Sequence, residues 1–222
     1  MLRLPALLLA VLALLAAGCG DGGGGGDASE TTTTTGSSGC TSVDVPKARE
    51  DGGATKPSKT LSADVTYTLT FSTNCGDFTI TLDQAAAPAT AASVVSLAKQ
   101  GFYDDTIIHR VSPRFVIQVG DPTQSGAGGP GYTTLDAPAA DAKYTHGVVA
   151  MAKTADEAPG TAGSQFFVVL ADDAQLPAEY AIVGEVTDGL DVVDRIGAIS
   201  SDPVTEVPSE PIVVSTVTVA ES

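Results

Sequence analysis

The sequence predicts a mainly β domain, a closed antiparallel barrel of about eight strands capped by two helices. Apolar and polar residues alternate at 65–71 and again at 78–82, and the turn Asn74-Cys75-Gly76-Asp77 lies between them. This arrangement predicts a β-hairpin. The later apolar runs are short, rich in β-branched residues and bounded by Gly or Pro, as is typical of strands. Only two segments, 87–101 and 188–196, have the signals of helices.

Each remaining element follows from the same rules. In 87–101, Pro88 can occupy the first helical position and Gly101 can end the helix, which gives about three turns. Segment 188–196 predicts a second, shorter helix, and 122–136 is a Gly-rich loop without the Lys-Ser/Thr signature of a phosphate-binding loop. The other predicted strands are 106–111, 114–119, 147–152, 165–170, 180–186 and 212–220.

The N-terminal residues 1–19 have the pattern of a bacterial export signal. Arg3 precedes an apolar run from Leu4 to Ala17, which is shorter than the roughly 20 residues needed to span a bilayer. The run ends in Ala16-Ala17-Gly18-Cys19, which resembles the lipobox of bacterial lipoproteins. That resemblance implies lipidation of Cys19 and a protein anchored to the outer face of the cell membrane. An ordinary secretory signal is the alternative.

Residues 20–62 are predicted to form a flexible tether before a folded domain at 63–222. The tether contains runs of Gly at 22–26 and of Thr at 31–35. Such a composition offers too few apolar side chains to offset the entropy lost on ordering.

The cysteine count indicates whether the exported domain could contain a disulfide. With Cys19 assigned to the lipid, Cys40 and Cys75 remain of the 3 cysteines. In an exported protein they suggest one disulfide, with two free thiols as the alternative.

Charge excludes some partners. The chain has 11 basic and 27 acidic residues, a formal net charge of −16. This balance argues against nucleic acid or an anionic lipid surface as an electrostatic partner. We therefore expect the protein to meet the membrane only through its lipid, and we separately expect it to be a monomer.

Several separated motifs carry a resemblance to a known family. Ile108-His109-Arg110 precedes Phe115, Gln118, Gly120 and Asp121, and the Gly-rich segment 126–129 and the run Gly163 to Phe167 follow. In this order and spacing they resemble the cyclophilin-type peptidyl-prolyl cis-trans isomerases, from about residue 65 to 220. The resemblance implies a barrel with two helices, isomerase activity and no cofactor.

The residue inventory fits that chemistry. We find no Ser-His-Asp or Cys-His set and no metal-ligand spacing, and His109 and His146 are the 2 histidines. Prolyl isomerisation needs no nucleophile, because its barrier of about 18–20 kcal/mol is lost amide resonance. His109 neighbours Arg110 and should lie on the opposite face of its strand, in a structural role.

The resemblance also assigns site residues. Arg110 would stabilise the twisted amide, Gln118 would position it, and Phe115 would complete the catalytic group. Lys153, Tyr180, Val116 and Gln175 depart from the best-known pattern, which has Asn, His, Met and Trp there. The implied substrate contacts are Val116, Met151, Phe167 and Leu176 in an apolar proline slot, Ala152, Lys153 and Thr154 along the preceding residues, Tyr180 against the ring, and Gly126 and Gln165 as further contacts.

We therefore expect a peptidyl-prolyl isomerase that assists the folding of exported proteins through their proline-containing segments. One alternative is a tethered module that binds proline peptides without catalysis. Another is a surface-tethered structural or adhesive protein, which would leave Arg110 unexplained.

Overall fold

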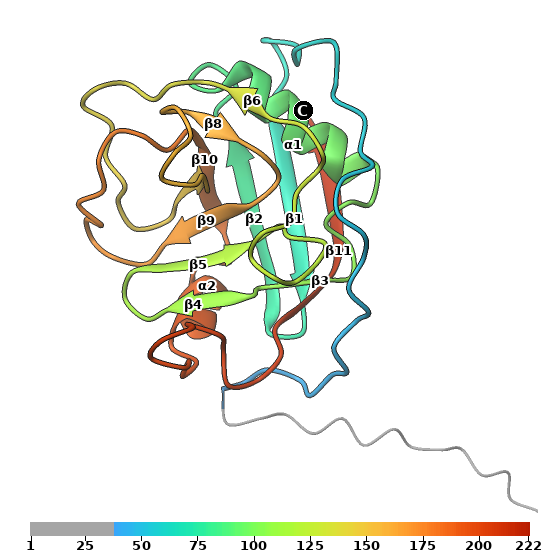
Figure 1. The fold of residues 1–222 in the computed structure, drawn as a ribbon, viewed down its shortest axis with the longest axis vertical. Coiled ribbons are helices and arrows are strands. Elements are labelled where there is room, and N and C mark those ends of the chain that lie inside the picture. The colour runs from blue at the N-terminus through green and yellow to red at the C-terminus, as the bar shows by residue number, and fades with distance from the viewer. Residues whose placement is uncertain (1–37) are drawn as a thin grey trace, which may run out of the picture. The chain divides into compact units, whose positions relative to one another are not determined.

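Antiparallel strands dominate the computed structural model, which describes residues 38–222 (Figure 1). A nine-stranded sheet has the order β3-β11-β1-β2-β10-β7-β9-β5-β4, and β6 and β8 form a separate pair. The strands are β1 (Tyr67–Thr73), β2 (Gly76–Leu82), β3 (Thr106–Ile107), β4 (Arg110–Ser112), β5 (Val116–Val119), β6 (Thr134–Leu135), β7 (Val148–Met151), β8 (Thr161–Ala162), β9 (Phe166–Val169), β10 (Ile182–Asp188) and β11 (Val213–Glu221), and the helices are α1 (Pro88–Lys99) and α2 (Leu190–Gly197).

The mainly β, antiparallel architecture with two helices confirms the predicted fold class, but the sheet is an incompletely closed half-barrel rather than a closed eight-stranded barrel. The segment predicted as one strand at 106–111 is split into β3 and β4, the two ends of the sheet order. Between them, the Ile108 amide donates to Ile212 O at 2.9 Å. The Val111 amide instead donates to Glu206 O at 2.8 Å. The two parts of segment 106–111 thus bond to different partners, and β3 and β4 do not pair with each other.

The predicted hairpin is confirmed as β1 and β2. Phe71 pairs with Phe78 and Leu69 with Ile80 across the two strands. The two phenylalanine rings stack with centroids 5.1 Å apart, and all four side chains are buried. The alternation seen in the sequence therefore places one face of the hairpin in the core.

Helix α1 begins at Pro88 as predicted, but its cap comes from elsewhere in the chain. Ala87, the residue before the helix, makes no side-chain capping bond. Instead the Asp136 carboxylate, which follows β6, accepts hydrogen bonds from the Thr90 amide at 2.7 Å and the Thr90 hydroxyl at 2.6 Å. These bonds satisfy a free amide at the first turn and tie α1 to the 134–136 segment.

The sheet has two apolar faces, and the smaller one carries the site. The inner face belongs to the main core, to which β5, β7 and β9 contribute Ile117, Met151 and Phe166. Alternate residues on the same strands point outward and form a second cluster. That outer cluster consists of Val116, Tyr144, Ala150, Phe167 and Val169, with Phe115, Leu176 and Tyr180 packed against it.

Residues 40–61 form a strap along the outside of the domain, blue in Figure 1. A disulfide joins Cys40 to Cys75 in the turn between β1 and β2, which confirms the predicted pair. Further along, the Gly52 amide donates to Gly129 O at 2.9 Å and the Ala54 amide to Pro130 O at 3.2 Å. This part of the chain differs from the flexible tether expected at 20–62, because the disulfide and these bonds hold it on the domain.

Several predictions fall outside the described residues: the export signal at 1–19, the lipidation of Cys19, and the tether up to residue 37. From residue 38 onward, none of the helices has the length and apolar character needed to cross a membrane.

Candidate active site

An apolar slot opens on the outer cluster, and strand pairing explains how its polar wall forms. Arg110 on β4 lies opposite Gln118 on β5, and Gln118 lies opposite Phe167 on β9. Residues that face one another across adjacent strands project to the same side of a sheet. The slot has a volume of about 200 Å³ and is lined by Arg110, Phe115, Val116, Gln118, Ala152, Lys153, Phe167, Leu176 and Tyr180.

The Arg110 guanidinium is held at the edge of this slot. Its Nη1 donates to Gln118 Oε1 at 3.1 Å, and its Nε is bonded to the Glu206 carboxylate. Its Cζ lies 5.9 Å from the centroid of the Phe115 ring. Nη2 makes no hydrogen bond to any described residue, so this nitrogen can donate to a bound molecule.

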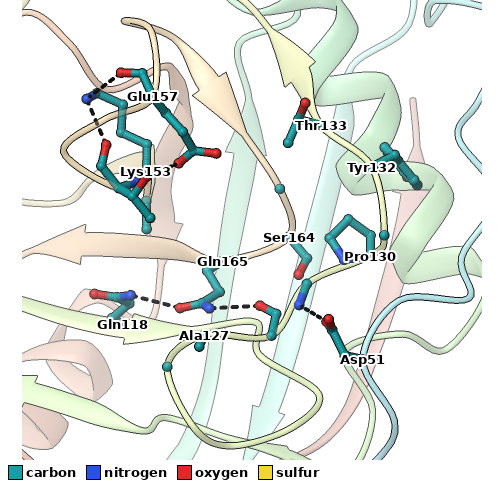
Figure 2. A pocket seen from close by; sticks show the side chains of 17 residues that line it. Asp51, Gln118, Ala127, Pro130, Tyr132, Thr133, Lys153, Glu157, Ser164 and Gln165 are labelled. Atoms are coloured by element: carbon teal, nitrogen blue, oxygen red, sulfur yellow. Dashed lines mark hydrogen bonds between the residues drawn. The ribbon is translucent and has the colours of Figure 1, made fainter.

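A chain of amides fixes Gln118 in turn (Figure 2). Gln118 Nε2 donates to Gln165 Oε1 at 2.9 Å, and Gln165 Nε2 donates to Gly128 O at 2.8 Å. In both side chains the amide nitrogen donates in the direction of the Gly-rich loop. Gln118 Oε1 is therefore left to accept from Arg110. The structure therefore brings Gln118, the predicted positioning partner, into hydrogen-bonding contact with Arg110.

Aromatic rings form the opposite wall of the slot. Tyr180 packs edge-on against Phe167, with centroids 5.5 Å apart. Tyr144 holds this wall from behind, since its hydroxyl donates to Tyr180 O at 2.8 Å and accepts from the Tyr180 amide at 3.1 Å. Sequence reasoning did not single out Tyr144, although a tyrosine in an apolar cluster commonly signals a buried hydrogen bond.

Lys153 adds no free charge to the site. Its side chain is only 2% exposed, and Nζ contacts Glu179 Oε2 at 3.0 Å. The same nitrogen donates to Glu157 O at 3.1 Å and to Thr154 O at 3.2 Å. The ammonium thus folds back onto its own loop, which leaves the neighbouring backbone of Ala152 and Lys153 at the slot.

One predicted contact is wrong: Met151 does not line the slot. It is fully buried in the main core, on the inner face of β7. Its neighbour Ala150 belongs to the outer cluster instead. Because the four residues of β7 are all apolar, their sequence gives no alternation to reveal which ones face the site.

A second cavity of about 590 Å³ adjoins the slot and shares Gln118, Ala152 and Lys153 with it. The remaining predicted contacts, Gly126, Thr154 and Gln165, line this cavity. Sequence reasoning missed Asp51 of the strap, which lies on the cavity wall and accepts from the Gly129 amide at 2.7 Å (Figure 2). The cysteine pair was the only sequence signal that the strap lies against the domain.

The buried Asp121 carboxylate organises the Gly-rich loop that lines the larger cavity. It accepts bonds from the Thr123 amide at 2.7 Å and the Gly126 amide at 2.5 Å. Burial raises the pKa of Asp121, but hydrogen bonds from Thr123, Gly128 and Gly126 outweigh this and lower it below its ordinary value. At Gly128 a Cβ would lie 2.3 Å from the carboxylate, so only glycine fits there.

The two histidines take no part in the slot. Both ring nitrogens of His109 are buried without a hydrogen-bond partner, and burial lowers its pKa despite the nearby Asp121 carboxylate. His146 Nε2 instead forms a hydrogen bond with Asp194 Oδ1 at 2.7 Å. Between residues 38 and 222 no cluster of His, Cys, Asp and Glu could hold a metal ion. The site can therefore hold an apolar ring beside a fixed cation.

The chain is similar to known proteins along most of its length. The family described as "Cyclophilin type peptidyl-prolyl cis-trans isomerase/CLD" matches residues 68–219. Peptidyl-prolyl cis-trans isomerase-like 1 of Aspergillus oryzae is 39% identical over 147 residues, 63% of this chain and 89% of the relative. Probable peptidyl-prolyl cis-trans isomerase A of Mycobacterium leprae is 37% identical over 172 residues, covering 69% of this chain and 92% of its own.

Solved structures agree with the sequence comparisons. A cyclophilin type peptidyl-prolyl cis-trans isomerase of Cryptosporidium parvum has a TM-score of 0.64 and 29% identity, covering 70% of this chain and 98% of its own. The same protein crystallised in the presence of the dipeptide Ala-Pro gives a TM-score of 0.64 and 30% identity, over 69% of this chain and 98% of its own. By sequence and by structure, the chain belongs to the cyclophilin-type peptidyl-prolyl cis-trans isomerase family.

Proposed function

We propose that the domain isomerises prolyl peptide bonds by stabilising the twisted amide with Arg110. The observation that carries the proposal is the fixed guanidinium at the edge of an apolar slot, bonded to Gln118 at 3.1 Å and packed near Phe115. A related structure was determined with Ala-Pro, which supports a proline peptide as the occupant.

The mechanism follows from the electronic structure of the amide. The proline ring enters the slot between Phe115, Phe167 and Leu176, while the residues before it lie along Ala152 and Lys153. As the peptide bond twists, the proline nitrogen loses conjugation and regains a localised lone pair. A guanidinium N–H then donates to this nitrogen more strongly than to the planar ground state, which lowers the barrier. No covalent bond forms or breaks.

Substitution of Arg110 tests this mechanism. Arg110→Ala removes a preorganised donor and should lower kcat by about 100-fold or more. Arg110→Lys should also fail, because an ammonium lacks the planar fork that Gln118 and Glu206 hold. Turnover is measured with a prolyl tetrapeptide in a protease-coupled assay, and circular dichroism checks the fold. Parental turnover in a folded Arg110→Ala protein would refute the mechanism.

The same assay addresses the alternative of a non-catalytic module. A protein that only binds proline peptides would bind the tetrapeptide without accelerating its isomerisation. We favour catalysis because the Arg110, Gln118 and Gln165 relay is complete, and a docking slot would not require it.

We further propose that the protein is an exported, monomeric lipoprotein that acts on proline-containing segments of other exported chains. Ala16-Ala17-Gly18-Cys19 after the apolar run supports lipidation of Cys19. The Cys40–Cys75 disulfide supports an oxidising compartment.

Metabolic labelling with a fatty acid in a bacterial host tests this location. The parent should incorporate the label, and Cys19→Ser should lose it and leave the membrane fraction. Equal labelling of both proteins would contradict the lipid site.

A further inference from the structure

A carboxylate outside the predicted site lies directly on the proposed catalytic arginine. Glu206 accepts a bond from Arg110 Nε across 96 residues of sequence. The two side chains are 31% and 30% exposed, so the pair is partly shielded from water. The pKa of Glu206 lies below its ordinary value: the hydroxyl of Ser112 lowers it most, burial raises it, and the Arg110 hydrogen bond and charge lower it further. Glu206 is therefore ionised at neutral pH.

The loop between α2 and β11 presents this carboxylate in a defined position. Glu206 O accepts from the Val111 amide on β4 at 2.8 Å, and the Glu206 amide donates to Asp202 O at 2.9 Å. The Asp202 carboxylate closes the same turn by accepting from the Thr205 amide at 2.7 Å. Glu206 itself has a φ of +57°, a left-handed conformation uncommon for this residue type. Its backbone is thus held by the loop and by the edge of β4.

We propose that Glu206 is a positioning residue for Arg110, an inference that rests on the proposed isomerase mechanism. Arg110 Nε is fixed by Glu206 and Nη1 by Gln118, so the planar group is constrained from two sides and Nη2 remains free to donate. A guanidinium held by one partner alone could rotate about its terminal torsions and lose alignment with the proline nitrogen. Glu206 acts by holding the Arg110 guanidinium in place. The length of its side chain therefore matters more than its negative charge.

Three substitutions separate reach from charge in the full chain. Glu206→Gln keeps the length and an acceptor oxygen, and we expect its kcat within about threefold of the parent. Glu206→Asp keeps the charge and tolerates left-handed φ but is one methylene shorter. Glu206→Asp and Glu206→Ala should therefore both lower kcat by roughly tenfold, because neither side chain reaches Arg110 Nε to hold the guanidinium in place, with little change in KM. Glu210→Ala, on the same loop and without a hydrogen bond to any described residue, is the matched control.

A double-mutant cycle shows whether the effect passes through Arg110. Adding Glu206→Ala to Arg110→Ala should change kcat by less than about twofold, because the group that Glu206 positions is gone. Exchange NMR of a prolyl tetrapeptide gives kcat and KM, and thermal melts check folding. An equal loss in both backgrounds would indicate a structural role and overturn the inference. A kcat equal to the parent's in Glu206→Asp would also overturn the inference. This variant should fold even if Glu206→Ala does not.

The outcomes for the two proposals are distinct. If Arg110→Ala matches the parent, the proposed mechanism itself fails, and with it the role of Glu206. If Arg110→Ala is slow while Glu206→Asp is fast, only the inference about Glu206 fails.

Discussion

Asp121 shows how one buried carboxylate shapes the substrate side of the molecule. Its oxygens accept amide hydrogens from the Gly-rich loop, and its folded pKa is lowered as a result. The carboxylate must be ionised to make all of these bonds, because a protonated oxygen would present a hydrogen instead. The Gly-rich loop, which lines the larger cavity, therefore depends on a charge that acid removes.

This dependence predicts acid sensitivity. The unfolded pKa of Asp is about 3.9, so the stabilisation by Asp121 is full above that value and is lost as pH falls through the lower folded pKa. Each pKa unit between the two states corresponds to about 1.4 kcal/mol. Urea unfolding of the parent and Asp121→Asn at pH 6 and pH 3 should show a smaller difference in stability at pH 3.

A matched control isolates the effect of Asp121 from other carboxylates. Asp64 is exposed and makes no hydrogen bond to a described residue. Asp64→Asn should show the same pH dependence as the parent. If Asp121→Asn also matches the parent at both pH values, the carboxylate does not stabilise the loop.

Single residues also mark the limit of prediction from sequence. Motif spacing and strand alternation were enough to predict which residues line the slot on its β4, β5 and β9 side. These are Arg110, Phe115, Gln118 and Phe167. Glu206 and Asp51 reach the site from a loop and a strap whose sequences have no regular period. Their positions depend on tertiary contacts across long stretches of chain, which no local pattern encodes.

Among the elements, α1 depends on a residue outside the helix for its first turn. Asp136→Ala removes the acceptor for both the amide and the hydroxyl of Thr90 and should lower the free energy of unfolding by about 1–2 kcal/mol. Urea titration measures the change. Asp141→Ala, an exposed acid on the following turn, should have little effect. Equal midpoints for the two variants would show that Asp136 is dispensable.

The strands show where element prediction succeeds. Both strands of the β1–β2 hairpin alternate cleanly, so their faces follow from sequence. The segment 106–111 also has a strand-like composition, but composition cannot reveal that β3 pairs with β11 while β4 pairs with β5. The break arises because the segment meets two different partners, and such pairing is decided by the fold as a whole.

For the whole molecule, the disulfide and the strap act together. Cys40 and Cys75 are separated by 35 residues, for which loop-closure entropy gives a stabilisation of about 3–4 kcal/mol. The strap also supports the Gly-rich loop, since Gln124 Nε2 donates to Pro46 O at 2.9 Å. Sequence composition predicted a flexible tether here and did not reveal these contacts. The strap is held by backbone hydrogen bonds and one disulfide rather than by an apolar face, and neither kind of contact leaves a signal in the composition.

Reduction should therefore loosen the strap before the barrel. We expect faster hydrogen exchange at the amides of Arg49, Gly52 and Ala54 in the reduced protein, while the β1–β2 amides stay protected. The Cys40→Ser, Cys75→Ser double variant should behave as the reduced protein does, with or without reductant. Unchanged exchange at the three strap amides after reduction would show that the disulfide is not what holds them.

The position of Cys40 at the start of the strap also determines how the domain bears mechanical load. A pull applied to the N-terminal side of Cys40 passes through the disulfide into the β1–β2 turn. The strap beyond Cys40, including Asp51 at the substrate cavity, lies outside that line of force. With the bond intact, tension leaves the Gly-rich loop undisturbed. With the bond reduced, the same tension would pull the strap away from its first residue onward and remove Asp51 from the cavity.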